Sequence, residues 1–285
     1  MKSFFLAARP KTLLVSIAPP LVSFFYANKY HEVPLYLLFC TVFAGMMIQL
    51  ATNFFNDLID HEKGADSIRL GPVRVSASGL VSQKTIKTWA FWSLGISVVL
   101  SIPLIYRGGP VILLLGLVSI YLSYGYTGGI LSLAYRGLGE LFVFLFFGLF
   151  SFLGSLYIYT YEFNSIGLSL ASQFGLLAVT FIGINNLRDR EQDKKVNKLT
   201  LATRMSGDSY KFLIMVSILG PYLLSFMTFL KPGIIQCGLL VGIPFSLYLY
   251  RWKGSELNTG LKVAAVHLTL FSILTILEIK NGSLF

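Results

Sequence analysis

Two short segments of the chain concentrate acidic and amide side chains. The first reads N-F-F-N-D-L-I-D-H-E-K-G-A-D from Asn53 to Asp66, and the second reads N-N-L-R-D-R-E-Q-D from Asn185 to Asp193. Carboxylates grouped this closely repel one another unless a cation neutralises them. Oxygen donors from Asp and Asn suit Mg²⁺, which also keeps bonds to substrate phosphates. The two segments therefore predict magnesium sites that together bind a diphosphate.

The spacing within each segment predicts that the polar side chains share one face of a helix. Residues three or four positions apart lie above one another on a helix. Two sets have this spacing, namely Asn53, Asp57 and Asp60 in the first segment and Asn186, Asp189 and Asp193 in the second. We therefore expect each segment to extend the end of a helix, with Asn56 beside the first face.

Basic side chains accompany both acidic segments and fit a phosphate ligand. Arginine and lysine bind phosphate oxygens through charge-assisted hydrogen bonds. An acidic loop that only sets membrane topology is the plainer alternative, but two such segments with helical spacing favour a binding site. The basic residues next to the acidic ones are Arg69, Arg74, Arg188, Arg190, Lys194, Lys195 and Lys198.

The composition indicates that these segments lie at the ends of membrane helices. Of 285 residues, 55% are hydrophobic and 13% are charged, with a mean hydropathy of +0.71, whereas soluble domains carry about 25% charged residues. This excludes a disordered chain and argues against a water-soluble enzyme. We expect one all-α transmembrane domain over residues 1–285, with nine spans. The expected spans are 12–27, 34–56, 86–106, 110–127, 137–157, 166–187, 211–230, 233–250 and 259–278.

The distribution of charge predicts the orientation of these spans. The net charge is +10, which we interpret as contact with anionic lipid and substrate and not with nucleic acid. With the N-terminus in the cytoplasm, all but four of the 23 Lys and Arg residues fall in cytoplasmic segments. This is the bias of a multi-pass membrane protein. The four exceptions are Lys29, Arg107, Lys231 and Lys280.

The acidic motifs carry a resemblance to a known family. N-D-L-I-D (56–60) resembles the first acidic motif of UbiA-type intramembrane aromatic prenyltransferases, and D-R-E-Q-D (189–193) with K-L-T-L (198–201) resembles the second. The position of Asp66, with R-L-G-P-V-R (69–74) behind it, is similar to the branch that prenylates 1,4-dihydroxy-2-naphthoate in menaquinone synthesis.

Further segments resemble the same branch. They are A-R-P-K-T-L (8–13), Y-T-G-G (126–129), A-Y-R-G-L-G-E-L-F-V-F-L-F-F-G (134–148) and N-N-L-R-D (185–189). The similarity extends from residue 8 to about residue 204. The chain departs from the family pattern at Asn197, where a glycine is expected.

The resemblance implies a fold and a reaction. The fold is a ring of nine transmembrane helices around a central cavity, in the cell membrane, with the active site open to the cytoplasm. The reaction is Mg²⁺-dependent transfer of a polyprenyl group from polyprenyl diphosphate to 1,4-dihydroxy-2-naphthoate, with loss of CO₂ and diphosphate. The resemblance makes Asp57, Asp60, Asp189 and Asp193 catalytic, and its metal ligands are Asn56, Asp57, Asp60, Asp66, Asp189 and Asp193.

The remaining candidates are substrate contacts, and several have structural alternatives. Arg136 either meets the carboxylate of the acceptor or pairs with Glu140 four positions later. Tyr124 either lines the cavity or packs in the membrane. The predicted substrate-binding set is Asn53, Arg69, Arg74, Tyr124, Arg136, Asn186, Arg188 and Lys198.

Two other functions remain open from the residues alone. In the first, the protein prenylates another aromatic acceptor, such as 4-hydroxybenzoate. In the second, it is a multi-pass transporter with acidic mouth loops. A transporter is expected to carry ionisable groups within its helices, and the expected spans hold almost none, which favours chemistry on an amphiphilic substrate.

Overall fold

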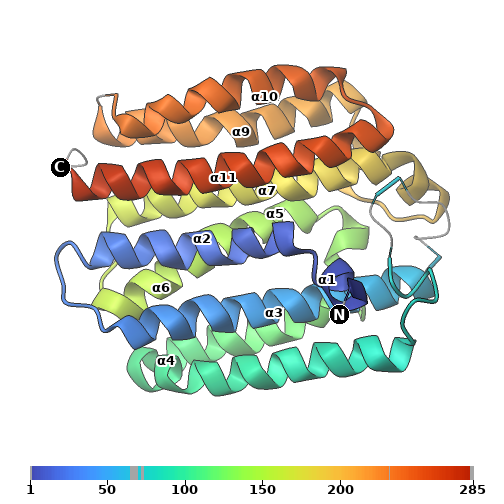
Figure 1. Ribbon diagram of the computed structural model, residues 1–285, viewed down its shortest axis with the longest axis horizontal. Helices are drawn as coiled ribbons and strands as arrows, with labels where there is room; N and C mark the ends of the chain where they lie inside the picture. The colour runs from blue at the N-terminus through green and yellow to red at the C-terminus, as the bar shows by residue number, and fades with distance from the viewer. Residues whose placement is uncertain (1, 65–69, 72–73, 231, 283–285) are drawn as a thin grey trace.

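Every regular element of the described chain is a helix. The structure is a computed structural model that describes residues 2–64, 70–71, 74–230 and 232–282. The long helices lie side by side with roughly parallel or antiparallel axes, and the chain ends lie towards opposite ends of the molecule (Figure 1). The elements are α1 (Lys2–Ala8), α2 (Pro10–Ala27), α3 (Leu35–Glu62), α4 (Gln83–Gly125), η1 (Leu133–Arg136), α5 (Gly139–Val143), η2 (Phe144–Phe150), α6 (Ser151–Thr160), α7 (Ser165–Lys195), α8 (Leu201–Arg204), α9 (Gly207–Phe229), η3 (Ile234–Gly238), α10 (Leu239–Arg251), η4 (Gly254–Glu256) and α11 (Leu257–Lys280).

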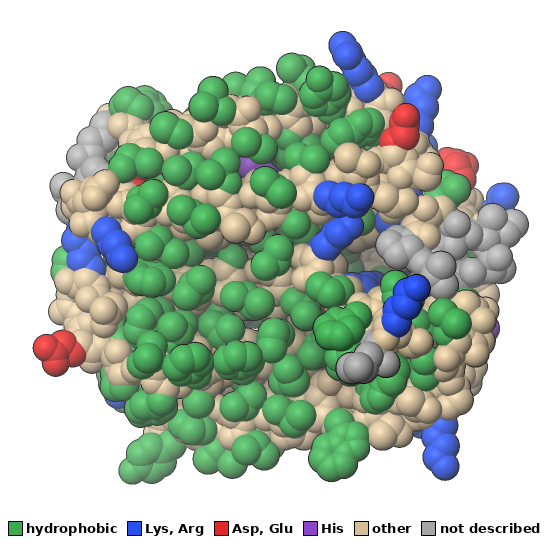
Figure 2. All heavy atoms as spheres, viewed as in Figure 1, with side chains coloured by type: hydrophobic (Ala, Val, Ile, Leu, Met, Phe, Trp, Pro, Cys, Tyr) green, Lys and Arg blue, Asp and Glu red, His purple; other side chains and the backbone are tan. Residues whose placement is uncertain are grey.

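The helices are those of a multi-pass membrane protein. Seven of them in the described residues are long and apolar enough to cross a membrane, or eight if α1 and α2, which meet at a bend of 53°, form one span. Apolar side chains cover the middle of the face in Figure 2, whereas charged side chains gather towards its two ends. This distribution is typical of a protein whose middle contacts lipid and whose two ends lie at the polar membrane interfaces.

Helix α4 folds back on itself at Gly109. This residue has a φ of 64°, outside the helical range, and Pro110 follows it. The two arms run side by side, because Phe91 of the first arm and Tyr124 of the second both contact the ring of Phe55. The sequence predicts a turn here between spans 86–106 and 110–127. A total of nine spans follows if each arm crosses the membrane, and this count stays a prediction.

A π-helical segment joins α5 to α6. Residues Phe144–Phe150 form a π-helix, η2, within one continuous helical stretch. Gly148 of this segment faces Gly175 of α7 so closely that a Cβ atom on Gly148 would lie 2.5 Å from the Cα atom of Gly175. The absent side chains allow the two backbones to approach, as small residues do in membrane helix pairs.

The acidic segments lie where the sequence predicts them, at the ends of two helices. Helix α3 continues through Asp57 and Asp60 to Glu62, and α7 continues through Asp189 and Asp193 to Lys195. Both helices extend beyond the expected spans, which end at residues 56 and 187. Two candidate residues, Asp66 and Arg69, lie outside the described residues.

Candidate functional site

One cavity connects both acidic segments with an apolar interior. Its volume is about 350 Å³, and it is lined by residues of α2 to α7 together with η1 and η2. Its interior is apolar with scattered hydroxyls, and includes Leu104, Ile112, Phe147 and Phe181. Its polar residues include Arg9, Asn53, Asn56, Asp60, Arg74, Asn185, Asn186, Arg188, Asp189 and Lys198.

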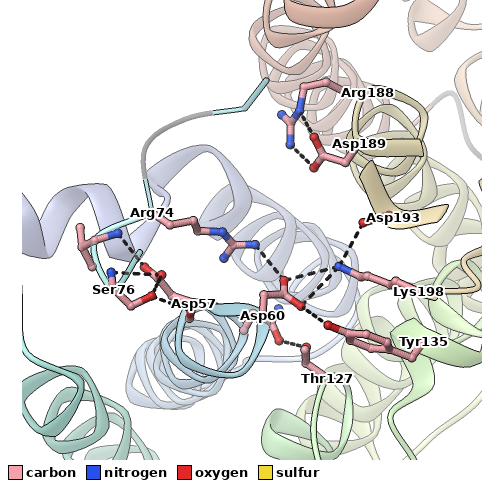
Figure 3. Close-up of polar contacts among 12 residues, drawn as sticks. Asp57, Asp60, Arg74, Ser76, Thr127, Tyr135, Arg188, Asp189, Asp193 and Lys198 are labelled. Atoms are coloured by element: carbon pink, nitrogen blue, oxygen red, sulfur yellow. Dashed lines mark hydrogen bonds and ion pairs between the residues drawn. The ribbon is translucent and has the colours of Figure 1, made fainter. Parts of the chain in front are cut away.

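Asp60 is the centre of the polar end of this cavity. Its carboxylate accepts a hydrogen bond from Arg74 Nη2 at 3.0 Å and one from the Tyr135 hydroxyl at 3.1 Å. Lys198 Nζ lies 3.4 Å from both of its oxygens. Figure 3 shows these three partners converging on Asp60 from different segments. Asp60 is 3% exposed, so these partners stabilise its charge away from water.

Lys198 joins the two acidic segments. Its ammonium lies 3.4 Å from Asp60 Oδ1 on one side and 3.8 Å from Asp193 Oδ1 on the other. One positive charge therefore lies between carboxylates from α3 and α7 (Figure 3). The arrangement supports the prediction that the two segments face each other, although they are far apart in the sequence.

Asp57 has a different environment from Asp60. Its carboxylate accepts hydrogen bonds from the backbone nitrogens of Val75 and Ser76 at 3.2 and 3.4 Å, and from the Ser76 hydroxyl at 2.6 Å. It is 1% exposed and lies outside the cavity lining defined by the described residues. Asp57 thus holds the segment that carries Arg74 against the end of α3.

Asp189 is paired with the residue before it. Arg188 donates to both carboxylate oxygens of Asp189 at 2.7 Å and also to Asn258 Oδ1 at 2.9 Å. Asn258 in turn donates to the carbonyl oxygen of Leu70. A Cβ atom on Gly71 would lie 2.7 Å from the Arg188 guanidinium. Arg188 therefore connects the second acidic segment with the chain that follows the first one.

The two asparagines of the first segment bind neighbouring protein groups. Asn53 donates to the Ala8 carbonyl oxygen at 2.8 Å and to the Thr12 hydroxyl at 3.1 Å. Asn56 accepts a hydrogen bond from Thr127. Both asparagines also line the cavity, so they position the walls of the site and remain accessible from it.

Two predicted substrate contacts lie away from the cavity in the described structure. Tyr124 is 45% exposed and packs against Phe55. Arg136 is exposed and donates to the Ile130 carbonyl oxygen at 2.8 Å. Glu140, its suggested partner, instead accepts hydrogen bonds from Asn186 and Tyr210. The Arg136–Glu140 ion pair considered from the sequence is therefore not formed.

The structure adds residues to the site that the sequence analysis did not select. Arg9 lines the cavity from the junction of α1 and α2, with a left-handed backbone at φ 50°. Lys63 donates to the Thr127 carbonyl oxygen at 2.9 Å and lies over the ring of Tyr135. Burial lowers the pKa of Lys63, Asp60 opposes this shift and Lys198 adds to it. The sequence signal for Arg9 was the A-R-P-K-T-L segment (8–13), which resembles the family.

The side chains at this end of the cavity include the carboxylate and amide types that bind divalent cations. The described residues contain no group of three His, Cys, Asp or Glu side chains arranged as one metal site. However, the Lys198 ammonium lies as a cation between Asp60 and Asp193, and Asn56 and Asp189 line the same cavity. Mg²⁺ is commonly bound by only a few protein oxygens, while substrate phosphates and water supply its remaining ligands.

Known proteins resemble this chain in sequence and in fold. The model of the UbiA prenyltransferase family matches residues 16–273. The chain is 33% identical to 1,4-dihydroxy-2-naphthoate octaprenyltransferase of Mycobacterium tuberculosis, over 71% of this chain and 69% of the relative, and 35% identical to the protein of the same name from Haemophilus influenzae, over 73% and 70%. A solved UbiA homologue from Archaeoglobus fulgidus bound to GPP and Mg²⁺ matches the fold with a TM-score of 0.62 at 16% identity, over 98% of this chain and 99% of that one. The chain therefore belongs to the UbiA prenyltransferase family and is an aromatic prenyltransferase.

Proposed function

We propose that this protein transfers a polyprenyl group from polyprenyl diphosphate to 1,4-dihydroxy-2-naphthoate, with loss of diphosphate and CO₂, to give demethylmenaquinone. The observation that supports it best is one cavity that joins both acidic segments and the basic side chains of Arg9, Arg74, Arg188 and Lys198 to an apolar interior. A prenyl diphosphate has the same division between a charged head and an apolar tail. The relatives named for naphthoate prenylation favour this acceptor.

The head of the donor would be bound by the basic residues at the cavity mouth. Arg74, Arg188 and Lys198 line the cavity, and each is paired with a carboxylate of the acidic segments. Binding of an anionic diphosphate would let these cations exchange a carboxylate partner for a phosphate oxygen. Charge-assisted hydrogen bonds of this kind hold the leaving group in one orientation.

Magnesium is the metal that we assign to the acidic residues. The candidate ligands are Asn56, Asp60 and Asp189, which line the cavity, and Asp193, which lies 3.8 Å from the lining residue Lys198. A metal role for Asp57 would require it to leave its loop partners. Bound Mg²⁺ would neutralise the charge on the diphosphate and favour its departure. The protein groups then need only to orient the donor and exclude water.

The apolar walls would protect the reactive end of the donor. Phe142, Phe146, Phe147 and Phe150 line the cavity from one helical stretch. Aromatic faces stabilise positive charge through their quadrupoles, and an apolar enclosure keeps water from capturing an allylic cation. The carboxylate of the acceptor would be bound by Arg9, which lies on the cavity lining, unlike Arg136.

We place the protein in the cell membrane, with the cavity mouth towards the cytoplasm and residues 1–285 acting as one domain. The excess of basic residues in the segments that include this mouth supports that orientation. Both substrates would then be reached from the side that has the greatest number of Lys and Arg residues.

Product analysis tests the proposal directly. Purified protein in detergent is given a polyprenyl diphosphate with 1,4-dihydroxy-2-naphthoate or with 4-hydroxybenzoate, each with Mg²⁺ and with excess EDTA. We expect a demethylmenaquinone product by mass spectrometry from the naphthoate alone, only with Mg²⁺. Product from 4-hydroxybenzoate alone would overturn the acceptor, and full activity in EDTA would overturn the metal assignment.

A further inference from the structure

A buried carboxylate lies behind the cavity wall, and the proposed reaction does not use it. Glu140 is in the first turn of α5 and is 5% exposed. Its Oε1 atom accepts a hydrogen bond from Asn186 Nδ2 at 2.8 Å and a second one from the Tyr210 hydroxyl. Three helical segments, α5, α7 and α9, therefore meet at one carboxylate oxygen.

Joining three helices through a buried carboxylate carries a large desolvation penalty. A charged group buried in a membrane domain is costly and is commonly functional. In addition, its Oε2 atom has no hydrogen-bond partner among the described residues. A neutral amide or hydroxyl would connect the same helices with a smaller desolvation penalty, so the carboxylate points to an effect on its neighbours beyond linking the helices.

Asn186 connects Glu140 to the cavity. It is the only one of the two partners that lines the cavity, within the described part of the chain. A carboxylate accepts hydrogen bonds and donates none. Glu140 therefore fixes which way the Asn186 amide faces, with its nitrogen towards Glu140 and its carbonyl oxygen available to a ligand.

The position of Asn186 matches the place where the two substrates must meet. Asn186 lies three residues before Asp189 on α7, which is about one helical turn deeper in the membrane. If the diphosphate is bound at the level of Asp60 and Asp189, the first carbon of the prenyl group lies next to it on the apolar side. The ring that attacks this carbon must then lie at the level of Asn186.

We propose that Glu140 is a positioning residue that orients Asn186 so that the Asn186 carbonyl oxygen accepts a hydrogen bond from a ring hydroxyl of the aromatic acceptor. This hydrogen bond selects hydroxylated rings and turns the attacking carbon towards the donor. The inference rests on the proposed function for the presence of a hydroxylated aromatic acceptor. It adds a residue that determines acceptor recognition without touching the acceptor.

The first test compares two substitutions of Glu140. Glu140→Leu removes the acceptor for the Asn186 amide, so it should raise the KM for the acceptor about 5- to 10-fold, as expected for one lost hydrogen bond. The KM for prenyl diphosphate should stay unchanged. Glu140→Gln still offers a carbonyl oxygen to Asn186 and should recover most of the acceptor affinity. An equal rise in both KM values would indicate a structural role and overturn the proposal.

A double substitution tests whether Glu140 acts through Asn186. Asn186→Ala alone should give the same selective rise in acceptor KM, and Glu140→Leu should add nothing to it. Gln173→Leu is the control, since Gln173 is also a buried polar residue of α7 but lies off the cavity lining. It should leave acceptor KM unchanged. Independent, additive effects of Glu140→Leu and Asn186→Ala would contradict the proposed link.

A third measurement identifies the hydroxyl and guards against misfolding. Inhibition constants are measured for 1-hydroxy-2-naphthoate and 4-hydroxy-2-naphthoate, each lacking one hydroxyl of the acceptor. Asn186→Ala should weaken one of them and leave the other unchanged. An equal effect on both would overturn the inference, and this arm holds even if Glu140→Leu fails to fold.

The failure of the proposed function would be distinguishable from the failure of this inference. The wild-type product decides the first question, and the variants decide the second. If the wild-type protein prenylates 4-hydroxybenzoate in place of the naphthoate, the proposed acceptor is wrong. The same variants then test whether Asn186 accepts a hydrogen bond from the single hydroxyl of 4-hydroxybenzoate. Benzoate is the inhibitor that lacks this hydroxyl.

Discussion

Asp57 and Asp60 belong to one motif, yet their carboxylates meet different chemical groups. Asp57 is held by donors of Val75 and Ser76, which are neutral, and it fixes a loop. Asp60 faces Arg74 and Lys198, which are cations, and it lines the cavity. The two aspartates of one motif therefore have different roles. Asp57 attaches the loop and Asp60 contributes charge to the cavity, because their side chains point in different directions from α3.

This difference predicts unequal effects of the same substitution. Asp60→Asn removes the charge that faces two cations and the proposed metal, so it should lower kcat by at least about 100-fold. Asp57→Asn keeps a carbonyl oxygen for the Ser76 hydroxyl and should retain more activity. Steady-state assays at saturating Mg²⁺ measure both. Equal losses would indicate that Asp57 moves to the metal when substrate binds.

A second prediction at this scale concerns the carboxylate of the acceptor. Arg9 lines the cavity, whereas Arg136 is exposed and binds the Ile130 carbonyl. Arg9→Gln should therefore raise the acceptor KM roughly 10-fold or more, the loss expected for a charge-assisted hydrogen bond. Arg136→Gln is the matched control and should change it little. The reverse order would restore Arg136 as the carboxylate contact predicted from the sequence.

At the scale of helices, hydropathy predicted the apolar spans, but it did not predict local features such as bends and the π-helix. The positions of α7, α9 and α11 follow from apolar runs, and the turn at Gly109 from the Gly-Gly-Pro sequence. The bend at Arg9, which precedes Pro10, and the π-helix, which packs closely against α7 at Gly148, were not predicted. Similarly, the spacing of Arg136 and Glu140 suggested an ion pair. Only the fold brings Tyr210, distant in sequence, to Glu140 and leaves Arg136 outside.

The π-helix gives a prediction about stability. Gly148 lies within 2.7 Å of the Ala171 carbonyl oxygen and the Gly175 nitrogen, measured from the position of an added Cβ atom. Gly148→Val would force η2 and α7 apart and should lower the free energy of unfolding by about 1–3 kcal/mol. Thermal unfolding in detergent measures this change. Gly116→Val is the control, since nothing lies within 4 Å of its added Cβ atom, and a comparable loss there would contradict the packing argument.

At the scale of the whole molecule, the helices enclose a cavity that is polar at one end and apolar along its length. The polar end lies where α3 and α7 pass beyond their apolar spans, and the apolar part lies between α2, the second arm of α4 and η2. The face of the molecule in Figure 2 is apolar in its middle and charged towards its ends. An amphiphilic donor can therefore place its head at the membrane interface and its tail within the membrane depth, without leaving the lipid for water.

The depth of the cavity predicts how the protein selects donor length. Gly116 lines the cavity about 15 Å below Tyr126, ten residues along the second arm of α4. Gly116→Leu places a side chain in open space within the cavity, so it should obstruct long prenyl tails and leave short ones unaffected. We expect kcat/KM to fall roughly 10-fold or more for a C20 or longer prenyl diphosphate and little for geranyl diphosphate, since overpacking of a buried site costs about 1–3 kcal/mol.

Gly95→Leu is the matched control, because Gly95 is also a glycine of α4 with nothing within 4 Å of its added Cβ atom but lies on the outer surface. Equal losses for short and long donors in Gly116→Leu, or the same selective loss in Gly95→Leu, would show that the prenyl tail follows another path through the molecule.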